Sequence, residues 1–81
     1  MRVNVLAFAR IRELLGSQAQ SVELPEGSTG DDLWRALSQR NAELGSLLPS
    51  TRIARNGRIV RFGDALCDGD EVALLPPVGG G

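Results

Sequence analysis

The chain has 81 residues, 42% of them hydrophobic, and a formal net charge of −1, which favours one small globular domain. The balanced charge lacks the basic excess of a nucleic-acid-binding protein, and one cysteine without any histidine excludes a disulfide framework and argues against a metal site. No apolar stretch approaches the length of a membrane span, and no secretory signal is evident. We therefore expect a cytoplasmic protein with no metal, cofactor, nucleic acid or membrane as a partner.

The N-terminal part of the chain alternates between strand and helix patterns. Side chains alternate from Arg2 to Phe8, which predicts a strand with at least one buried face. From Ala9 to Leu15 apolar side chains fall at helical spacing, and Gly16 is placed as the residue past the end of a short helix. Alternation returns from Gln20 to Leu24 and predicts a second strand that pairs with the first.

A longer helix is predicted after the break at Pro25-Glu26-Gly27. Thr29 is a suitable N-cap, and Asp32 three residues later forms an imperfect capping box because glutamate or glutamine is preferred there. Gly45 is expected to end this helix, followed by a loop. Its apolar face is predicted to contain Leu33, Ala36, Leu37 and Leu44, with Trp34 at the margin, and the loop to contain Leu47, Leu48 and Pro49.

The C-terminal half contains a hairpin and a last strand. Two short runs, Arg52 to Arg55 and Arg58 to Arg61, flank Asn56-Gly57, the strongest two-residue hairpin signal. Asp68-Gly69-Asp70 predicts a turn, and the nearly continuous apolar run Glu71 to Leu75 predicts a central strand. This order predicts an α+β domain in which a mixed sheet of about five strands carries one main helix, as in the ubiquitin-like β-grasp arrangement.

The side-chain chemistry argues against a self-sufficient enzyme. The sequence has no histidine, tyrosine or lysine, so carboxylates are its only conventional acid–base groups, and they cluster where a helix start and a turn explain them. Cys67 falls in that turn and is not favoured as a sulfur relay. The hairpin arginines have two interpretations: they dock an acidic partner, or they charge a sheet edge against strand addition.

The end of the chain is its most informative feature. Three glycines, Gly79 to Gly81, follow the apolar and rigid run Leu74 to Val78. Without side chains they form a thin stalk with a bare carboxylate, which suits insertion into a narrow cleft. The competing interpretation is a frayed terminus. We expect residues 1–78 to form the domain and residues 79–81 a flexible tail.

Three segments together resemble the small, sulfur-carrying subunit of molybdopterin synthase, a family of ubiquitin-like sulfur carriers. They are Phe8 to Gly16, Asp68 to Ala73, and the ending Pro76-Pro77-Val78 followed by glycines. The resemblance implies that an ATP-dependent activating enzyme adenylates Gly81, and that sulfur from a donor protein then replaces the adenylate to give a thiocarboxylate. It also implies that the carrier is a non-catalytic subunit of a heterotetramer, whose large subunit passes the sulfur to a cyclic pyranopterin precursor.

The resemblance also suggests roles for individual residues. Gly79 and Gly80 thread the tail into partner active sites, and Pro76 and Pro77 stiffen its base, since proline fixes φ. The remaining docking candidates are the apolar residues Phe8, Leu75 and Val78, together with Arg12, which could pair with an acidic group on a partner.

Three other functions stay open. A sulfur carrier for thiamin synthesis would use the same chemistry up to the thiocarboxylate, and a ubiquitin-like modifier would attach the activated tail to a target lysine. A β-grasp interaction module would use no chemistry at all, and deletion of Gly80 and Gly81 would leave its function intact.

Overall fold

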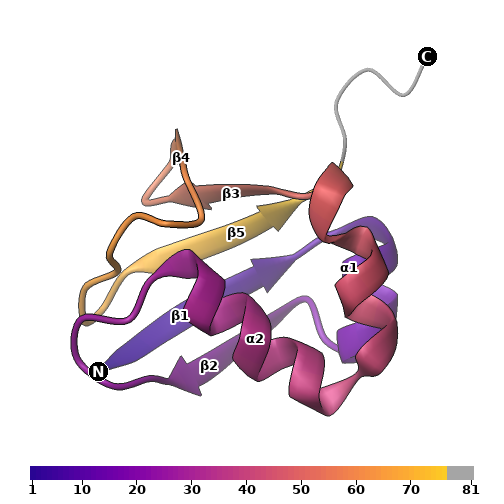
Figure 1. Ribbon diagram of the computed structural model, residues 1–81, viewed down its shortest axis with the longest axis horizontal. Coiled ribbons are helices and arrows are strands. Elements are labelled where there is room, and N and C mark those ends of the chain that lie inside the picture. The colour runs from indigo at the N-terminus through magenta and orange to yellow at the C-terminus, as the bar shows by residue number, and fades with distance from the viewer. Residues whose placement is uncertain (77–81) are drawn as a thin grey trace.

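The computed structural model describes residues 1–76, so Pro77, Val78 and the predicted tail, Gly79, Gly80 and Gly81, lie outside the described residues. The described part alternates strands and helices along the chain (Figure 1). Its elements are β1 (Arg2–Ala7), α1 (Ala9–Leu15), β2 (Ala19–Glu23), α2 (Gly30–Arg40), the 3₁₀-helix η1 (Ala42–Ser50), β3 (Arg52–Arg55), β4 (Arg58–Val60) and β5 (Glu71–Leu75). The α+β prediction is confirmed.

The five strands form one mixed sheet in the order β2-β1-β5-β3-β4. The central pair, β1 and β5, is parallel, and the other neighbours are antiparallel. The predicted pairing of the first two strands and the central place of β5 are therefore confirmed. In Figure 1 the helices lie on one side of the sheet, and within residues 1–76 no helix covers the other side, which we call the open face.

The hydrophobic core lies between the sheet and the helices. Strand alternation sends every second side chain toward α2, and the helices return apolar side chains from their inner faces. The sheet contributes Val3, Val5, Ala7, Val22, Ile53, Val72 and Leu74, and the helices contribute Ile11, Leu33, Trp34, Leu37 and Leu44. One core therefore holds α1, α2 and η1 against the same face.

The predicted helix boundaries at Gly16 and Thr29 are confirmed. Gly16 follows α1 in the left-handed conformation, with φ of 77°, and its N–H donates to Arg12 O at 2.9 Å. At the start of α2 the capping box is complete: Thr29 N donates to Asp32 Oδ2 at 2.9 Å, and Asp32 N donates to Thr29 Oγ1 at 3.3 Å. The backbone hydrogen bond from Thr29 is the main reason that the pKa of Asp32 lies below its usual value.

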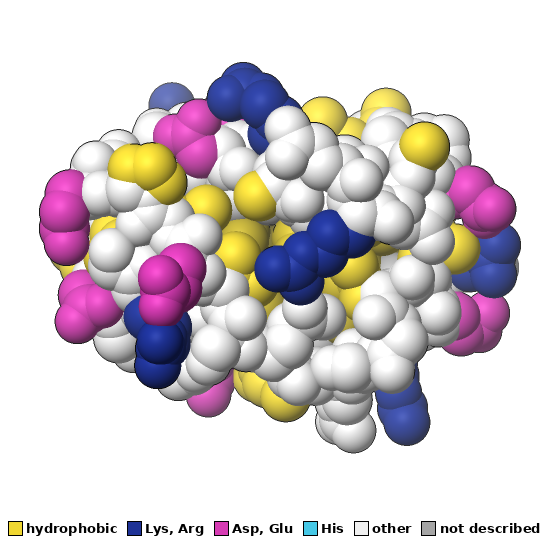
Figure 2. Space-filling model, turned by 90° about the horizontal axis from the view of Figure 1, so that it is seen from below, with side chains coloured by type: hydrophobic (Ala, Val, Ile, Leu, Met, Phe, Trp, Pro, Cys, Tyr) yellow, Lys and Arg dark blue, Asp and Glu magenta, His cyan; other side chains and the backbone are white. Residues whose placement is uncertain are grey.

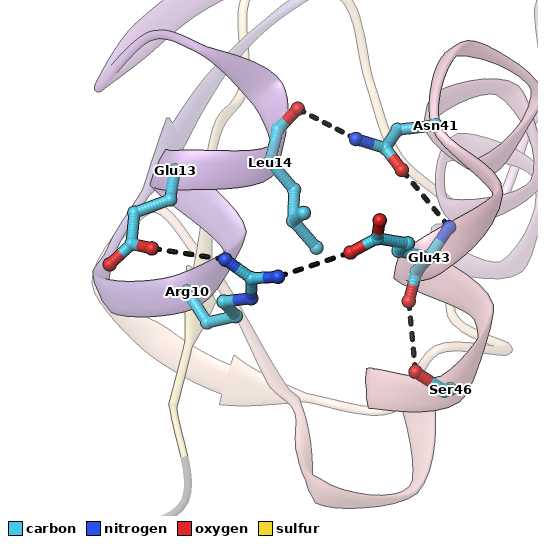
Figure 3. Close-up of polar contacts among 6 residues, drawn as sticks. All are labelled: Arg10, Glu13, Leu14, Asn41, Glu43 and Ser46. Atoms are coloured by element: carbon cyan, nitrogen blue, oxygen red, sulfur yellow. Dashed lines mark hydrogen bonds and ion pairs between the residues drawn. The ribbon is translucent and has the colours of Figure 1, made fainter.

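The predicted end of the long helix at Gly45 is wrong. Helix α2 ends at Arg40, because Asn41 leaves the helical conformation with φ of −150° and ψ of 109°. Asn41 Oδ1 accepts a hydrogen bond from Glu43 N at 3.0 Å and so caps η1, while Asn41 Nδ2 donates to Leu14 O at 3.1 Å (Figure 3). One side chain thus joins three helices. Leu44 is buried as expected, but from η1.

Other differences from the predicted elements are smaller. The expected loop around Leu47 to Pro49 is the second half of η1. Strand β1 ends one residue early because Phe8 is the N-cap of α1, and β2 begins and ends one residue earlier than predicted. Strand β4 ends at Val60 because the backbone N–H of Arg61 donates a hydrogen bond to Asp64 Oδ2, at 3.0 Å, in the turn that follows.

Candidate docking site at the tail end of the sheet

The chain leaves the sheet from its centre. Strands β1 and β5 run parallel, and their register pairs Ala7 with Leu74 (Figure 1). Phe8 follows directly after β1 and is therefore level with Leu75. Pro76 follows Leu75 at the same end of the sheet. This tail end is where the C-terminal segment joins the domain.

An apolar row crosses the whole open face one step away from the tail end. The pairing registers place one residue from each strand at the same level and on the same side: Ala19, Leu6, Ala73, Ala54 and Ile59. Three of the five are alanines, whose small side chains project little above the sheet, so most of the row is flat. Ile59 at its end is 57% exposed, more than Phe8, the other exposed large hydrophobic side chain of residues 1–76.

The open face changes in polarity from one end of the sheet to the other. Phe8 and Leu75 lie at the tail end, and Phe8 is 36% exposed. The next level away from the tail, beyond the apolar row, is polar and contains Asn4, Ser21 and Glu71. The opposite end carries the exposed ion pair of Arg2 and Glu23, with 2.6 Å between Nη2 and Oε1. Along β2, β1 and β5 the open face is therefore apolar next to the tail and charged at the opposite end.

The face seen from the side of β2 shows no comparable gradient (Figure 2). Seen from the side of β2, acidic and basic side chains are interspersed around small hydrophobic patches (Figure 2). Several of these charges form ion pairs, and Arg10 contacts both Glu13 and Glu43 at 3.1 Å (Figure 3). Such exposed pairs contribute little to stability, about 0–1 kcal/mol each.

A small apolar cavity adjoins the tail end. Its volume is about 190 Å³, and it lies where the start of α1, the end of η1 and the end of β5 meet. Its lining includes Phe8, Ile11, Leu47, Thr51 and Pro76. The cavity extends the apolar surface around the base of the tail.

The predicted docking residues fall in two places. Phe8, Leu75 and Pro76 lie together at the tail end, Leu75 half-buried and the other two exposed. Arg12 lies apart from them on the exposed side of α1, in a recess lined by Ala9, Glu13 and residues 16–18. Pro77, Val78 and the three glycines lie outside the described residues.

Sequence reasoning missed Ile59. The run Arg58-Ile59-Val60 held the necessary signal, because two successive β-branched residues in a strand point to opposite faces. Val60 packs against the core, so Ile59 must face outward. Only the sheet register shows that it lies level with Ala54, Ala73 and Leu6.

Cys67 lies at the wrong end of the sheet to exchange sulfur with the base of the tail. It is an exposed thiol in the turn before β5, whereas the tail leaves from the end of that strand.

Among residues 1–76 no three His, Cys, Asp or Glu side chains gather in a way that could hold a metal ion. In the same described part, no helix has the length and hydropathy of a membrane span.

The sheet order, the single core and the C-terminal exit define a ubiquitin-like β-grasp domain. A ubiquitin from Caldiarchaeum subterraneum superposes with a TM-score of 0.63 at 17% identity, covering 100% of this chain and 98% of that one, which supports the fold alone. The ThiS family matches residues 5–81. The chain therefore belongs to the ThiS family.

Curated relatives match along the full chain. A protein from Chlamydomonas reinhardtii, named "Molybdopterin synthase sulfur carrier subunit", is 40% identical over 83 residues and covers 100% of both chains. The protein of the same name from Escherichia coli is also 40% identical, over 98% of this chain and 99% of its own. "Small archaeal modifier protein 1" from Haloferax volcanii is 34% identical over 91% of this chain and 94% of its own.

Solved structures give the same likeness. The "Putative molybdopterin converting factor, subunit 1" from Pyrococcus furiosus has a TM-score of 0.86 and 35% identity, over 96% of this chain and 99% of that one. A chain in the "Protein-protein complex of subunit 1 and 2 of Molybdopterin-converting factor" from Helicobacter pylori has a TM-score of 0.69 and 30% identity, covering 100% of both chains.

Proposed function

We propose that this protein is a sulfur carrier in molybdenum cofactor biosynthesis, and that Gly81 is the residue that carries the sulfur. The observation that carries the proposal is the full-length likeness to the Chlamydomonas and Escherichia proteins that bear the name of this subunit. The position of the end of β5 supports it, because the described chain leaves the sheet there beside the apolar residues Phe8 and Leu75.

The proposed chemistry takes place on the terminal carboxylate. An ionised carboxylate is a poor electrophile, so it must first be converted to an acyl-adenylate, with release of pyrophosphate from ATP. A sulfur donor protein then supplies sulfur at the oxidation level of sulfide, which attacks the acyl carbon, breaks its bond to AMP and leaves a thiocarboxylate on Gly81. In molybdopterin synthase this sulfur passes to a cyclic pyranopterin precursor. The carrier itself is non-catalytic, and the active site belongs to the large subunit.

The tail is suited to entering two different active sites in turn. From Pro77 the last five residues can reach about 17 Å when extended. Gly79 and Gly80 keep this reach narrow, while Pro76 and Pro77 restrict its base and lower the conformational entropy lost on insertion. The protein partners in this scheme are an ATP-dependent activating enzyme, a sulfur donor and the large subunit, all in the cytoplasm.

The large subunit is proposed to dock on the open face at the tail end. The solved complex from Helicobacter pylori contains subunits 1 and 2 of the relative's converting factor, so a chain similar to this one is found bound to a second subunit. In this chain the exposed apolar residues Phe8 and Ile59, with Leu75 between them, provide the contact surface. Val78 would extend that surface along the tail, and Arg12 would pair with a carboxylate beside it in a heterotetrameric assembly.

Intact-mass measurement tests the proposal. The protein is mixed with an activating enzyme of this family, ATP and a sulfur donor, and the expected product gains the mass difference between sulfur and oxygen at Gly81. A variant without Gly80 and Gly81 is the matched control and should stay unmodified. An unchanged mass of the full chain with an enzyme that activates its own carrier contradicts the proposal.

A ubiquitin-like modifier is the second candidate, because the Haloferax relative is named a modifier protein at 34% identity. Both functions share the adenylated tail, and they differ in the acceptor. A modifier would form an amide between Gly81 and a target lysine, which is visible as a higher-mass conjugate resistant to thiols. A carrier for thiamin synthesis would reach the same thiocarboxylate but would not transfer its sulfur within molybdopterin synthase.

A further inference from the structure

We infer that Arg52 and Arg61 form a basic pair on the open face, beside the exit of the tail, which selects a partner surface bearing carboxylates opposite it. The pair adds positive charge to the border of the apolar docking surface at the tail end of the sheet. The inference rests on the proposed function only in taking the large subunit as the partner, and it concerns recognition and not sulfur transfer.

The sheet register places Arg52 at the base of the tail. Arg52 is paired directly with Leu75, the last residue of β5, and is exposed. It is two residues before Ala54, so it lies on the same side of the sheet as the apolar row. Directly paired residues have Cβ atoms about 5 Å apart, so the stem of Arg52 lies against Leu75.

Arg61 lies on the same face at the same level. Val60 and Phe62 both pack against the core, while Ile59 and Arg61 are exposed, so the alternation of β4 continues one residue beyond the strand. The hairpin register ends with Ile53 opposite Val60, and we extend it by one residue to place Arg61 beside Arg52. Two guanidinium groups therefore lie next to the Ala54 and Ile59 part of the apolar row, on its tail side.

The other two hairpin arginines lie elsewhere. Arg55 and Arg58 are paired with each other and lie on the side of the sheet that carries α2. Arg55 Nε also donates to Asp70 Oδ2 at 2.6 Å and is neutralised within the domain. The run of four arginines thus divides into a pair on the side of the sheet that carries α2 and a pair on the open face.

Neither guanidinium of the open-face pair forms an ion pair within residues 1–76. Arg2, Arg10, Arg35 and Arg55 each form an ion pair in this part of the chain, whereas Arg52 and Arg61 form none. The nearby Asp64 carboxylate accepts the backbone N–H of Arg61. Like charges facing each other across strands are destabilising, so the domain itself gains nothing from this arrangement. A carboxylate on a partner would offset the repulsion between the two guanidinium groups and would make the arrangement favourable in the complex.

The position of the pair defines how it would act. Interfaces place apolar contacts at the centre and charged groups at the rim, and rim charges mainly change the association rate and its dependence on salt. The apolar row with Phe8 and Leu75 is the centre, and Arg52 with Arg61 is the rim next to the tail. The partner surface should therefore carry acidic residues near the entrance that receives the tail.

Stopped-flow association with the large subunit tests the inference. The variants are Arg52→Glu, Arg61→Glu and their combination, compared at about 0.1 M and about 1 M salt, where the Debye length is about 10 Å and about 3 Å. Arg58→Glu is the matched control for each single variant, because it makes the same change in net charge on the other side of the same hairpin. Thermal unfolding of each variant verifies the fold.

At low salt we expect the double variant to associate about tenfold more slowly than the wild type, and the difference to disappear at high salt. Arg58→Glu should associate within about twofold of the wild type. An undiminished rate in the double variant, a loss that persists at high salt, or an equal loss in Arg58→Glu would overturn the inference. If the wild type itself fails to bind the large subunit, the proposed function fails instead, and the intact-mass assay decides that separately.

Discussion

Arg55 and Asp70 form an ion pair at the hairpin, with 2.6 Å between Nε and Oδ2, and only 5% of Asp70 is exposed. Asp70 also accepts hydrogen bonds from Cys67 N at 2.7 Å and from Asn56 Nδ2 at 2.9 Å. Asn56 Oδ1 in turn accepts a hydrogen bond from Glu71 N at 2.9 Å. The hairpin of β3 and β4 is thereby tied to the start of β5, the strand from which the tail leaves.

Asp70→Ala should lower the free energy of unfolding by about 2–4 kcal/mol. The substitution leaves the Arg55 guanidinium half-buried without its counter-ion and the Cys67 N–H without an acceptor. Chemical denaturation measures the effect. Glu71→Ala, at the exposed neighbouring position, is the control and should change stability by less than about 0.5 kcal/mol. Equal losses in the two variants would contradict this role of Asp70.

Acid should weaken the same connection. Burial raises the pKa of Asp70, but hydrogen bonds from Arg55, Cys67 N and Asn56 outweigh it, so the pKa lies below its usual value. The stabilisation is therefore complete above the unfolded pKa of about 4 and is lost as pH falls through the lower folded value. Unfolding free energies measured from neutral pH downward should fall less steeply below about pH 4 in Asp70→Asn than in the wild type. Parallel curves would refute the assignment.

Gly30→Ala should destabilise the domain by about 1–3 kcal/mol, although alanine is the better helix former. A Cβ at Gly30 would lie 2.9 Å from both Ile53 Cδ1 and Phe62 O. The carbonyl of Phe62 cannot easily move, because it accepts a hydrogen bond from Asp31 N at 2.8 Å. Gly45→Ala is the control, since a Cβ there meets nothing within 4 Å, and its melting temperature should stay close to that of the wild type. A stable Gly30→Ala protein would show that the contact relaxes.

Ile59→Asp should weaken binding to the large subunit by about tenfold without lowering stability. Ile59 is 57% exposed at the end of the apolar row, so a charge costs little in the free domain but would be desolvated in the complex. Calorimetric titration provides the affinity. Ile59→Val keeps the apolar contact and should bind almost as the wild type does. If Ile59→Asp binds equally well, the row does not belong to the interface.

Local sequence signals predicted much of the secondary structure. Asn56-Gly57 placed the hairpin, and Asn56 takes a positive φ of 50°, as that turn requires. The apolar run Glu71 to Leu75 predicted the central strand, because a strand with neighbours on both sides is largely buried. The end of α2 was missed because Leu44 continues the helical spacing, while the side chain of Asn41 binds Leu14 O, far away in the sequence.

The sequence by itself determined the strands, the positions of α1 and of the start of α2, and the glycine ending, because these depend on neighbouring residues and on spacing along the chain. It also contained the motifs that resemble the sulfur carriers. Only the tertiary structure decided which exposed side chains stand together. Ile59 and Leu6 are far apart in sequence, and strand register alone brings them to one level of the open face. Register likewise separates Arg52 from Arg55, since adjacent pairing steps point to opposite sides of a sheet.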